Sequence, residues 1–391
     1  MDARTAAGVS RTPAYVFSLD EFAQRCRLTA DILGSSIGLC YSIKANPFLL
    51  GTLPEVFRYI EVCSPGELTI CEKTGMRMES IIFSGVNKQK ADISRAIKDG
   101  VRIFTAESRL HFEMLRECSA QENAPLEVLL RLSAGSQLGM SREDIFAIIR
   151  ERKSAPLLEI KGLHYFSVTQ KKKPEKLEKE LQLIEEFVQE VRAELGFSFE
   201  RLEYGCGLAV DYFSEDRENT EPERLKAIAP ALKSLSEKMD VTVEMGRFFA
   251  APCGYYVTTV ADAKTTDANY LICDGGINQL HYDGQIQAMQ LPVIRHIPAE
   301  RAEGEKTPWV VCGSLCTSAD ILARNLLLND PKPGDRLVFT WCGAYSAMEG
   351  MALFLSRELP AVYLHTEEGG LKLVRDIIPA DSFNTPCVFA K

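Results

Sequence analysis

The sequence has few histidines and no closely spaced cysteine pair. Five histidines and twelve cysteines occur in 391 residues, and no two cysteines have the C-x-x-C spacing. Zinc sites are commonly built from such pairs, and disulfide scaffolds are typical of short secreted chains. We therefore expect no metal site and no disulfide framework, and a reduced, cytoplasmic protein.

Long apolar runs and a net positive charge are also absent. No stretch reaches the roughly 18 apolar residues that a membrane-spanning helix requires, and we expect no export segment at the N-terminus. The formal net charge is −9, so neither nucleic acid nor an anionic membrane is an expected partner. The one basic run, Lys171-Lys172-Lys173, is expected to be a solvated loop.

What the sequence does contain is an alternation of strand and helix patterns. The predicted strands end near Lys44, Cys63, Ser84, Phe104, Leu132, His164, Tyr204 and Met245. The clearest helical periodicity runs from Pro174 to Leu195. This alternation predicts an α/β fold with a (β/α)8 TIM barrel over residues 35–249. Residues 250–391 are rich in β-branched and aromatic runs, and together with residues 1–34 they are predicted to form a second, mainly β domain.

One lysine stands at a position that calls for an explanation. The apolar run from Ile37 to Ile43 predicts a buried strand, and Lys44 follows it, just before the break made by Asn46 and Pro47. A lysine at a strand end is either a surface residue with its ammonium in water or a desolvated amine that can act as a nucleophile. Other residues of the chain are needed to distinguish these two interpretations of Lys44.

Other polar residues follow the predicted strands, where a barrel gathers its chemistry. Two glycine loops follow consecutive predicted strands, namely Gly205-Cys206-Gly207 and Glu244-Met245-Gly246-Arg247. Each is either a simple turn or a loop whose backbone N–H groups can approach an anion. Because there are two of them on consecutive strands, a phosphate site is favoured. His164 is a core histidine or a ring that stacks on a ligand. Lys44, an imidazole, a phosphate cradle and an acidic Glu244 form the set that pyridoxal phosphate chemistry needs.

Six motifs in this order resemble the fold-type III pyridoxal-phosphate decarboxylases, which include the diaminopimelate and ornithine decarboxylases. The resemblance extends from about Tyr15 to Tyr345, which is most of the chain. The motifs are Tyr41-Ser42-Ile43-Lys44-Ala45-Asn46-Pro47, Gly162-Leu163-His164, Gly205-Cys206-Gly207, Glu244-Met245-Gly246-Arg247, Cys312-Gly313-Ser314-Leu315-Cys316-Thr317-Ser318-Ala319-Asp320 and Gly343-Ala344-Tyr345.

The resemblance implies an alanine-racemase-type barrel with a β domain, pyridoxal 5′-phosphate as cofactor, and a homodimer with active sites at the interface. It implies that Lys44 is the Schiff-base lysine, that His164 stacks on the cofactor ring and that Glu244 binds the pyridine nitrogen. The residues that would hold the phosphate or line its pocket are Ser167, Gly207, Gly246, Arg247 and Tyr345. Cys316, supplied by the partner subunit, would protonate the carbanion left after carbon dioxide departs, although a buried apolar cysteine is the alternative.

The sequence departs from the diaminopimelate pattern where the substrate side chain would bind. Thr317 follows the cysteine, where those enzymes have a glutamate that grips a distal amino group. After the motif that begins at Asp274, His281 or Tyr282 takes the place of a carboxylate-binding arginine. Residues 164–170, His-Tyr-Phe-Ser-Val-Thr-Gln, are closer to the branch found in antibiotic and siderophore pathways.

The sequence therefore predicts a pyridoxal-phosphate-dependent α-decarboxylase of a modified or side-chain-extended amino acid, for example one linked to a carrier or to citrate, in a biosynthetic pathway such as siderophore production. Three alternatives stay open. The first is a diaminopimelate or ornithine-type decarboxylase, against which Thr317 and Tyr282 count. The others are an amino-acid racemase, which the Cys316 motif disfavours, and an inactive homologue that acts as a binding partner.

Overall fold

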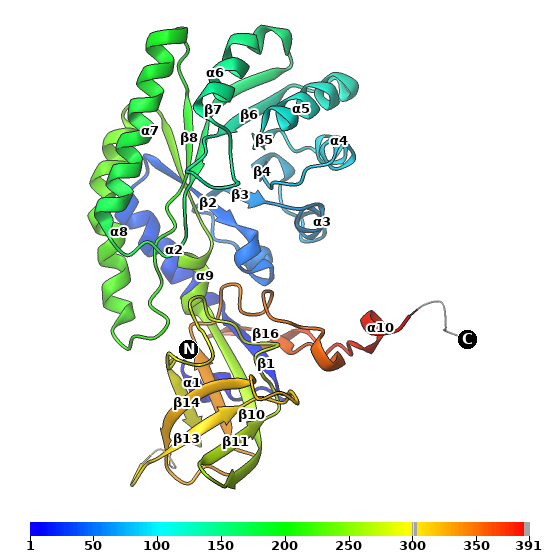
Figure 1. The fold of residues 1–391 in the computed structure, drawn as a ribbon, viewed down its shortest axis with the longest axis vertical. Helices are drawn as coiled ribbons and strands as arrows, with labels where there is room; N and C mark the ends of the chain where they lie inside the picture. The colour runs from blue at the N-terminus through cyan, green and yellow to red at the C-terminus, as the bar shows by residue number, and fades with distance from the viewer. Residues whose placement is uncertain (299, 301–302, 387–391) are drawn as a thin grey trace. The chain divides into compact units, whose positions relative to one another are not determined.

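The chain forms two compact units. The structure, a computed structural model, describes residues 1–298, 300 and 303–386 (Figure 1). The barrel unit comprises Cys26–Val210 and Glu218–Phe248, and the β unit comprises Met1–Arg25, Asp211–Arg217 and Phe249–Lys391. These units depart from the domain bounds expected from the sequence at residues 26–34, 211–217 and 249. Within the β unit, Arg217 donates to Thr340 Oγ1 at 2.6 Å.

The barrel unit is built on eight parallel strands that close on themselves, which confirms the predicted fold class. Each strand pairs with the next along the chain, and the last pairs with the first. The strands are β2 (Ile37–Ser42), β3 (Phe57–Val62), β4 (Ile81–Phe83), β5 (Ile103–Ala106), β6 (Leu126–Arg131), β7 (Leu158–Phe166), β8 (Arg201–Gly205) and β9 (Asp240–Met245). Because all eight run in parallel, their carboxyl ends meet at one end of the barrel.

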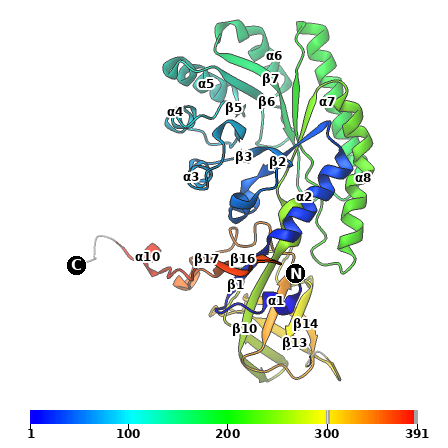
Figure 2. The same cartoon turned by 180° about the vertical axis from the view of Figure 1, so that it is seen from behind.

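Helices cover the outside of these strands, as the views from both sides show (Figures 1 and 2). They are α2 (Leu19–Leu33), α3 (Pro65–Lys73), α4 (Lys90–Lys98), α5 (Arg109–Glu122), α6 (Arg142–Glu151), α7 (Pro174–Leu195) and α8 (Arg217–Ser236). Serine side chains cap α3, α5 and α6 by accepting a backbone N–H of the first turn. Helix α7 buries Leu177, Leu181, Ile184, Phe187 and Val191 at the spacing that predicted it.

The β unit contains one nine-stranded sheet. Its strands are β1 (Ala14–Ser18), β10 (Gly254–Thr265), β11 (Asn269–Cys273), β12 (Ile294–Ile297), β13 (Thr307–Cys312), β14 (Ile321–Leu328), β15 (Arg336–Thr340), β16 (Ala361–Thr366) and β17 (Gly370–Arg375). Strand β1 lies between β10 and β16, so the N-terminal segment belongs to this sheet. The described residues also form three short α-helices, namely α1 (Ala3–Ala6), α9 (Arg247–Ala250) and α10 (Asp381–Asn384).

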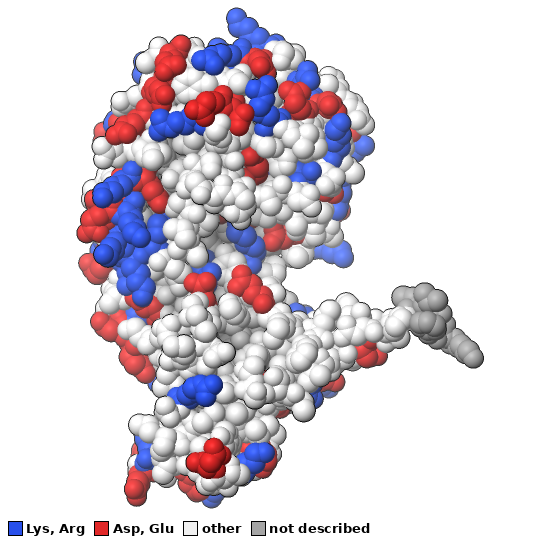
Figure 3. Space-filling view, in the orientation of Figure 1, with Lys and Arg blue, Asp and Glu red and all other residues white. Residues whose placement is uncertain are grey.

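Charged side chains of both signs cover the helical exterior of the barrel unit. On the face drawn in Figure 3, lysine and arginine are interspersed with aspartate and glutamate. None of the helices described in residues 1–298, 300 and 303–386 combines the length and apolarity needed to cross a bilayer.

Candidate active site

Lys44 lies at the carboxyl end of the first barrel strand. It occupies a 3-10 turn, Ile43–Ala45, that follows β2. The hydroxyl of Tyr41 donates to the carbonyl of Asn46 at 2.9 Å and fixes the turn, while the Asn46 side chain caps the next one by accepting the N–H of Phe48 at 3.0 Å. The chain therefore holds Lys44 at this strand end, with 38% of its side chain exposed.

Two carboxylates from the neighbouring strands hold the amine of Lys44. Its Nζ lies 2.5 Å from Oε2 of Glu61 on β3 and 3.6 Å from Oε1 of Glu244 on β9. The side chains of Glu61 and Glu244 are 3% and 9% exposed, so water screens the interaction weakly. Ser42 Oγ lies 3.0 Å from Glu61 Oε2 and 2.5 Å from Glu244 Oε1, and its single proton can go to either carboxylate.

His164 joins this group from β7. Its Nε2 lies 3.2 Å from Oε2 of Glu244, and the side chain is 2% exposed. Its other ring nitrogen, Nδ1, has no hydrogen-bond partner within the described part of the chain. Burial alone would raise the pKa of Glu244, but Lys44, His164 and Ser42 together hold that pKa well below its usual range. Glu244 is therefore ionised at neutral pH.

Cys63 lies beside the same amine, at the end of β3. Its Sγ is 3.6 Å from Lys44 Nζ and donates to Glu61 Oε1 at 2.9 Å. Burial, followed by the charge of Glu61, raises the pKa of the thiol far above its usual range. Cys63 is therefore a neutral hydrogen-bond donor that orients Glu61.

A third carboxyl group, that of Glu203 on β8, is fully buried in the barrel. Neither of its oxygens accepts from an N–H or O–H group among the described residues, and the thiol of Cys40 lies beside the carboxyl group. Burial, followed by the charges of Glu244 and Glu61, raises the pKa of Glu203 well above its usual value. Glu203 is therefore protonated at neutral pH, and it adds no negative charge beside Glu244.

Four of the five predicted phosphate residues follow strands β7, β8 and β9 in the barrel unit, namely Ser167, Gly207, Gly246 and Arg247. Gly207 has a φ of +58°, and a Cβ there would lie 2.2 Å from the carbonyl oxygen of Val168, so no side chain fits. A Cβ on Gly246 would lie 2.6 Å from that of Ala45, in the turn that carries Lys44. Arg247 is the first residue of α9.

Ser167 and Lys171 meet beside these glycine loops. Ser167 Oγ donates to Glu180 Oε1 at 2.5 Å, and Lys171 Nζ donates to Ser167 Oγ at 3.2 Å. Lys171 is 3% exposed, so the prediction of a solvated loop is wrong for this residue. Lys172 and Lys173 are exposed.

Cys316 and Thr317 belong to the β unit and lie on an exposed loop after β13. Asp320 fixes this loop: its carboxylate accepts the N–H of Leu315 at 2.7 Å and that of Ile277 at 2.8 Å. A Cβ on Gly313 would lie 2.3 Å from the same carboxylate, which explains the glycine in the motif. The loop therefore presents the thiol of Cys316 to the outside of the single chain.

The remaining predicted residues also lie in the β unit. The carboxylate of Asp274 accepts from the hydroxyls of Thr12 and Thr258, each at 2.6 Å, and Tyr282 is buried with its hydroxyl donating to Thr340 at 2.8 Å. His281 is 41% exposed, with Nε2 3.7 Å from Oε2 of Glu349. Tyr345 has a φ of +65°. The polar atoms of Asp274 and Tyr282 are thus engaged inside the unit, whereas His281 is accessible.

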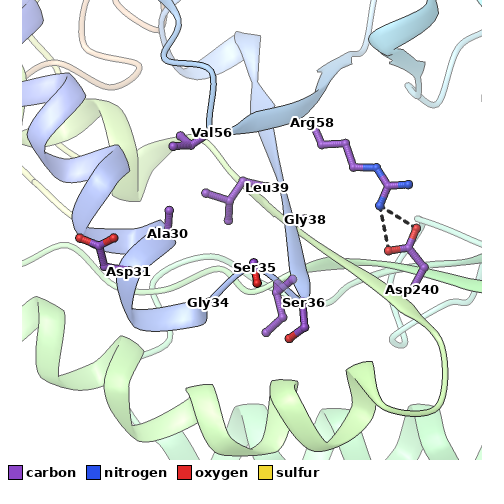
Figure 4. Close-up of a pocket in the computed structure, with 11 residues that line it drawn as sticks. Ala30, Asp31, Gly34, Ser35, Ser36, Gly38, Leu39, Val56, Arg58 and Asp240 are labelled. Atoms are coloured by element: carbon purple, nitrogen blue, oxygen red, sulfur yellow. Dashed lines mark hydrogen bonds and ion pairs between the residues drawn. The ribbon is translucent and has the colours of Figure 1, made fainter.

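The amino ends of the strands carry a cavity of about 630 Å³ (Figure 4). Arg58, at the start of β3, points to Asp240, at the start of β9, and its Nη1 lies 2.9 Å from both carboxylate oxygens. Ser35 and Ser36 line the cavity as well. Because this cavity lies at the strand starts, it belongs to the opposite end of β2 from Lys44.

The sequence interpretation missed four residues of the site, namely Glu61, Cys63, Glu203 and Lys171. Glu61 and Glu203 stand inside apolar strands, and this pattern is the signal that could have identified them, since such carboxyl groups need a reason to be buried. No comparable signal separates Lys171 from Lys172 and Lys173.

The chain is similar to known proteins over most of its length. Residues 19–251 match a family model described as pyridoxal-dependent decarboxylase, pyridoxal binding domain. The chain is 26% identical to diaminopimelate decarboxylase from Aquifex aeolicus, with 93% of this chain and 89% of that protein covered. It is 21% identical to a solved diaminopimelate decarboxylase from M. jannaschii, with 100% and 96% covered and a TM-score of 0.87, which shows the shared fold.

Two other relatives are named as decarboxylases of larger conjugates. One is L-glutamyl-[BtrI acyl-carrier protein] decarboxylase from Niallia circulans, 24% identical with 93% of this chain and 91% of that protein covered. The other is 2-[(L-alanin-3-ylcarbamoyl)methyl]-2-hydroxybutanedioate decarboxylase from Staphylococcus aureus, 25% identical with 90% and 93% covered. The chain is thus similar both to diaminopimelate enzymes and to enzymes for larger conjugates.

Replacement of Glu203 by glutamine should make the stability of the protein less sensitive to pH. The pKa of Glu203 is higher in the folded than in the unfolded chain. Below the usual pKa of glutamate the carboxyl group is protonated in both states, so Glu203 does not lower the free energy of unfolding. As pH rises above that value, the group ionises first in the unfolded chain, and the free energy of unfolding falls. We expect the melting temperature of Glu203→Gln to match that of the wild type near pH 4.5 and to exceed it increasingly up to pH 8. Thermal unfolding across this range measures the difference.

The control for this experiment is Glu194→Gln, which changes an exposed glutamate on α7 in the same unit. Its melting temperature should follow that of the wild type at every pH. A difference between Glu203→Gln and wild type that stayed constant from pH 4.5 to pH 8 would mean that Glu203 is ionised in the folded protein.

Proposed function

Because the chain belongs to the pyridoxal-dependent decarboxylases of fold-type III, with pyridoxal 5′-phosphate as cofactor, we propose that it removes the α-carboxylate from an amino acid whose side chain is already extended or conjugated. A biosynthetic role such as siderophore production fits this substrate class. The observation that carries the proposal is Lys44 held between the buried Glu61 and Glu244 beside His164.

The residues at the carboxyl end of the barrel fit the cofactor. Lys44 offers an amine, and His164 has a buried ring nitrogen without a partner among the described residues. Ser167, Gly207, Gly246 and Arg247 are proposed to hold the phosphate, together with Tyr345. When bound, pyridoxal phosphate supplies an electron sink that stabilises negative charge at the substrate Cα.

The chain's own groups prepare that chemistry by placing protons. Lys44 must lose a proton from Nζ before it can act as a nucleophile, and Glu61 Oε2, 2.5 Å away, can accept it. Glu244 stays ionised and can hold a proton at the pyridine nitrogen of the cofactor. His164 would pack against the ring of the cofactor, and its contact with Glu244 fixes the imidazole.

The proton that replaces the carboxylate needs a donor, and we propose Cys316 from the partner subunit of a homodimer. Its loop is rigidly held by Asp320, and its thiol is exposed in the single chain. The β unit also exposes apolar side chains that a second subunit would cover. Among them, Met351, Leu353, Phe354, Leu355 and Phe383 are each more than 40% exposed. In Figure 3 the segment that leads to α10 shows few charged groups.

The substrate side chain is proposed to lie near His281 and Thr317, which are accessible. Thr317 is short and neutral, so it offers no charge for a distal ammonium. Asp274 and Tyr282 are proposed to position this region, because their polar atoms are bound within the β unit. The similarity to diaminopimelate decarboxylases keeps that activity as the second candidate.

One prediction from the proposed function concerns the substrate. The purified enzyme with bound cofactor should release carbon dioxide from amino acids whose side chain is amide-linked to a carboxylate-bearing group, with kcat/KM about tenfold or more above that for diaminopimelate or ornithine. The reason is that Thr317 cannot pair with the distal ammonium of the latter two. Carbon dioxide release from a panel of both kinds measures the ratio.

The same assay separates the alternatives. Fastest release from diaminopimelate or ornithine would establish the second candidate. Exchange of the Cα hydrogen with retention of the carboxylate would establish a racemase. No reaction with any amino acid, in spite of bound cofactor, would point to an inactive homologue.

Another prediction concerns the proton donor across the proposed dimer interface. Lys44→Ala and Cys316→Ala should each be inactive as decarboxylases when purified alone. If the two are mixed under conditions that exchange subunits, half of the dimers carry one site with both residues intact, which gives about a quarter of the wild-type activity. Recovery in the mixture is measured by carbon dioxide release.

Mixing each variant with itself is the control and should restore nothing. If Lys44 and Cys316 acted within one chain, the mixture would stay as inactive as its components, and the proposal of a shared site would be wrong.

A further inference from the structure

Lys171 is a buried lysine in the loop between β7 and α7. It is 3% exposed, whereas the next two residues, Lys172 and Lys173, are exposed. Its Nζ donates to Glu180 Oε2 at 2.5 Å and to Ser167 Oγ at 3.2 Å, and it lies 5.5 Å from the centre of the Tyr204 ring. A buried ammonium is costly, so its partners and position call for an explanation.

The backbone fixes Lys171 against the glycine loop that follows β8. The N–H of Lys171 donates to the carbonyl of Gly207 at 2.8 Å, and the N–H of Ala209 donates to the carbonyl of Lys171 at 3.1 Å. A Cβ on Gly207 would lie 3.1 Å from Cε of Lys171. The side chain therefore runs directly beside the loop that is proposed to bind the phosphate.

Glu180 keeps the ammonium in place. Its carboxylate on α7 accepts from Lys171, from Ser167 at 2.5 Å and from the hydroxyl of Tyr204 at 2.7 Å. Such a buried pair contributes little net stability, because the desolvation of both charges offsets their attraction. The pair does, however, fix a positive charge and the Ser167 hydroxyl in one place.

Two of the three N–H bonds of the Lys171 ammonium have acceptors in the described part of the chain, which leaves one for a ligand. The ammonium also donates to the oxygen of Ser167, so the proton of that hydroxyl can turn from Glu180 to an anion. A phosphate monoester carries a charge near −2 at neutral pH, whereas Arg247, the one cation among the residues proposed above for the phosphate, supplies a single positive charge.

We propose that Lys171 is a further binding residue for the phosphate of the cofactor, with Glu180 as the residue that positions it. This inference rests on the proposed function, because it takes Ser167 and Gly207 as part of the phosphate cradle. The expected ligand group is a phosphate monoester dianion.

The test compares Lys171→Met with Lys172→Met, which removes an exposed charge one residue away. The cofactor is first removed from the full-length chain. The chain is then titrated with pyridoxal phosphate and, separately, with pyridoxal, which lacks the phosphate. Lys171→Met should weaken pyridoxal phosphate binding about tenfold to a hundredfold, the range for a lost charge-assisted contact, and leave pyridoxal binding unchanged. Lys172→Met should bind both compounds like the wild type.

Two more variants keep the test decisive if Lys171→Met folds poorly. Lys171→Gln retains neutral hydrogen bonding and should show the same selective loss, whereas Lys171→Arg retains the charge and should recover much of the affinity for pyridoxal phosphate. Glu180→Gln should weaken pyridoxal phosphate binding more than pyridoxal binding, because the ammonium loses its anchor.

The outcomes separate this inference from the proposed function. Equal losses for pyridoxal phosphate and pyridoxal in Lys171→Met and Lys171→Gln, or no loss in either, would overturn the role of Lys171 and leave the enzyme assignment intact. A wild-type chain that does not bind pyridoxal phosphate more tightly than pyridoxal would instead contradict the phosphate cradle itself.

Discussion

The ion pair between Lys44 and Glu61, with Glu244 on its other side, is the interaction on which the rest of the site depends. Strand β2 pairs with β3 on one side and, because the barrel closes, with β9 on the other, so Glu61 and the distant Glu244 meet around one amine. Removal of Lys44 would leave Glu61 and Glu244 without their full positive charge, while Ser42 would still hydrogen-bond to them. The barrel therefore fixes the lysine, and the lysine in turn keeps two carboxylates in the interior.

Three buried carboxyl groups share this part of the barrel, and their charge states differ by environment. Glu244 is ionised because Lys44, His164 and Ser42 overcome the effect of burial on its pKa, whereas the pKa of Glu203 is raised by burial and by the two nearby charges. A neutral Glu203 limits the negative charge that one ammonium has to balance. This division leaves Glu244 as the anion that is proposed to bind the cofactor nitrogen.

Much of the fold could be predicted from the sequence, because strand and helix periodicities are local properties. The barrel, Lys44 at a strand end, and the grouping of His164 with Glu244 follow from that pattern. The burial of Lys171 could not, since three adjacent lysines look alike and only the pairing with Glu180 on α7 distinguishes one of them. The inclusion of Asp211–Arg217 in the β unit likewise depends on contacts that no local pattern reveals.

The most direct test of the account is to reduce the cofactor-loaded enzyme with borohydride and to map the labelled peptide. We predict that the reduced cofactor is attached to Lys44 in near-stoichiometric amount, because that amine alone is held at the carboxyl end of the barrel by Glu61 and Glu244 among the described residues. Label on other lysines, or the absence of stable label, would mean that Lys44 is an ordinary strand-end residue, and the proposed chemistry would be wrong.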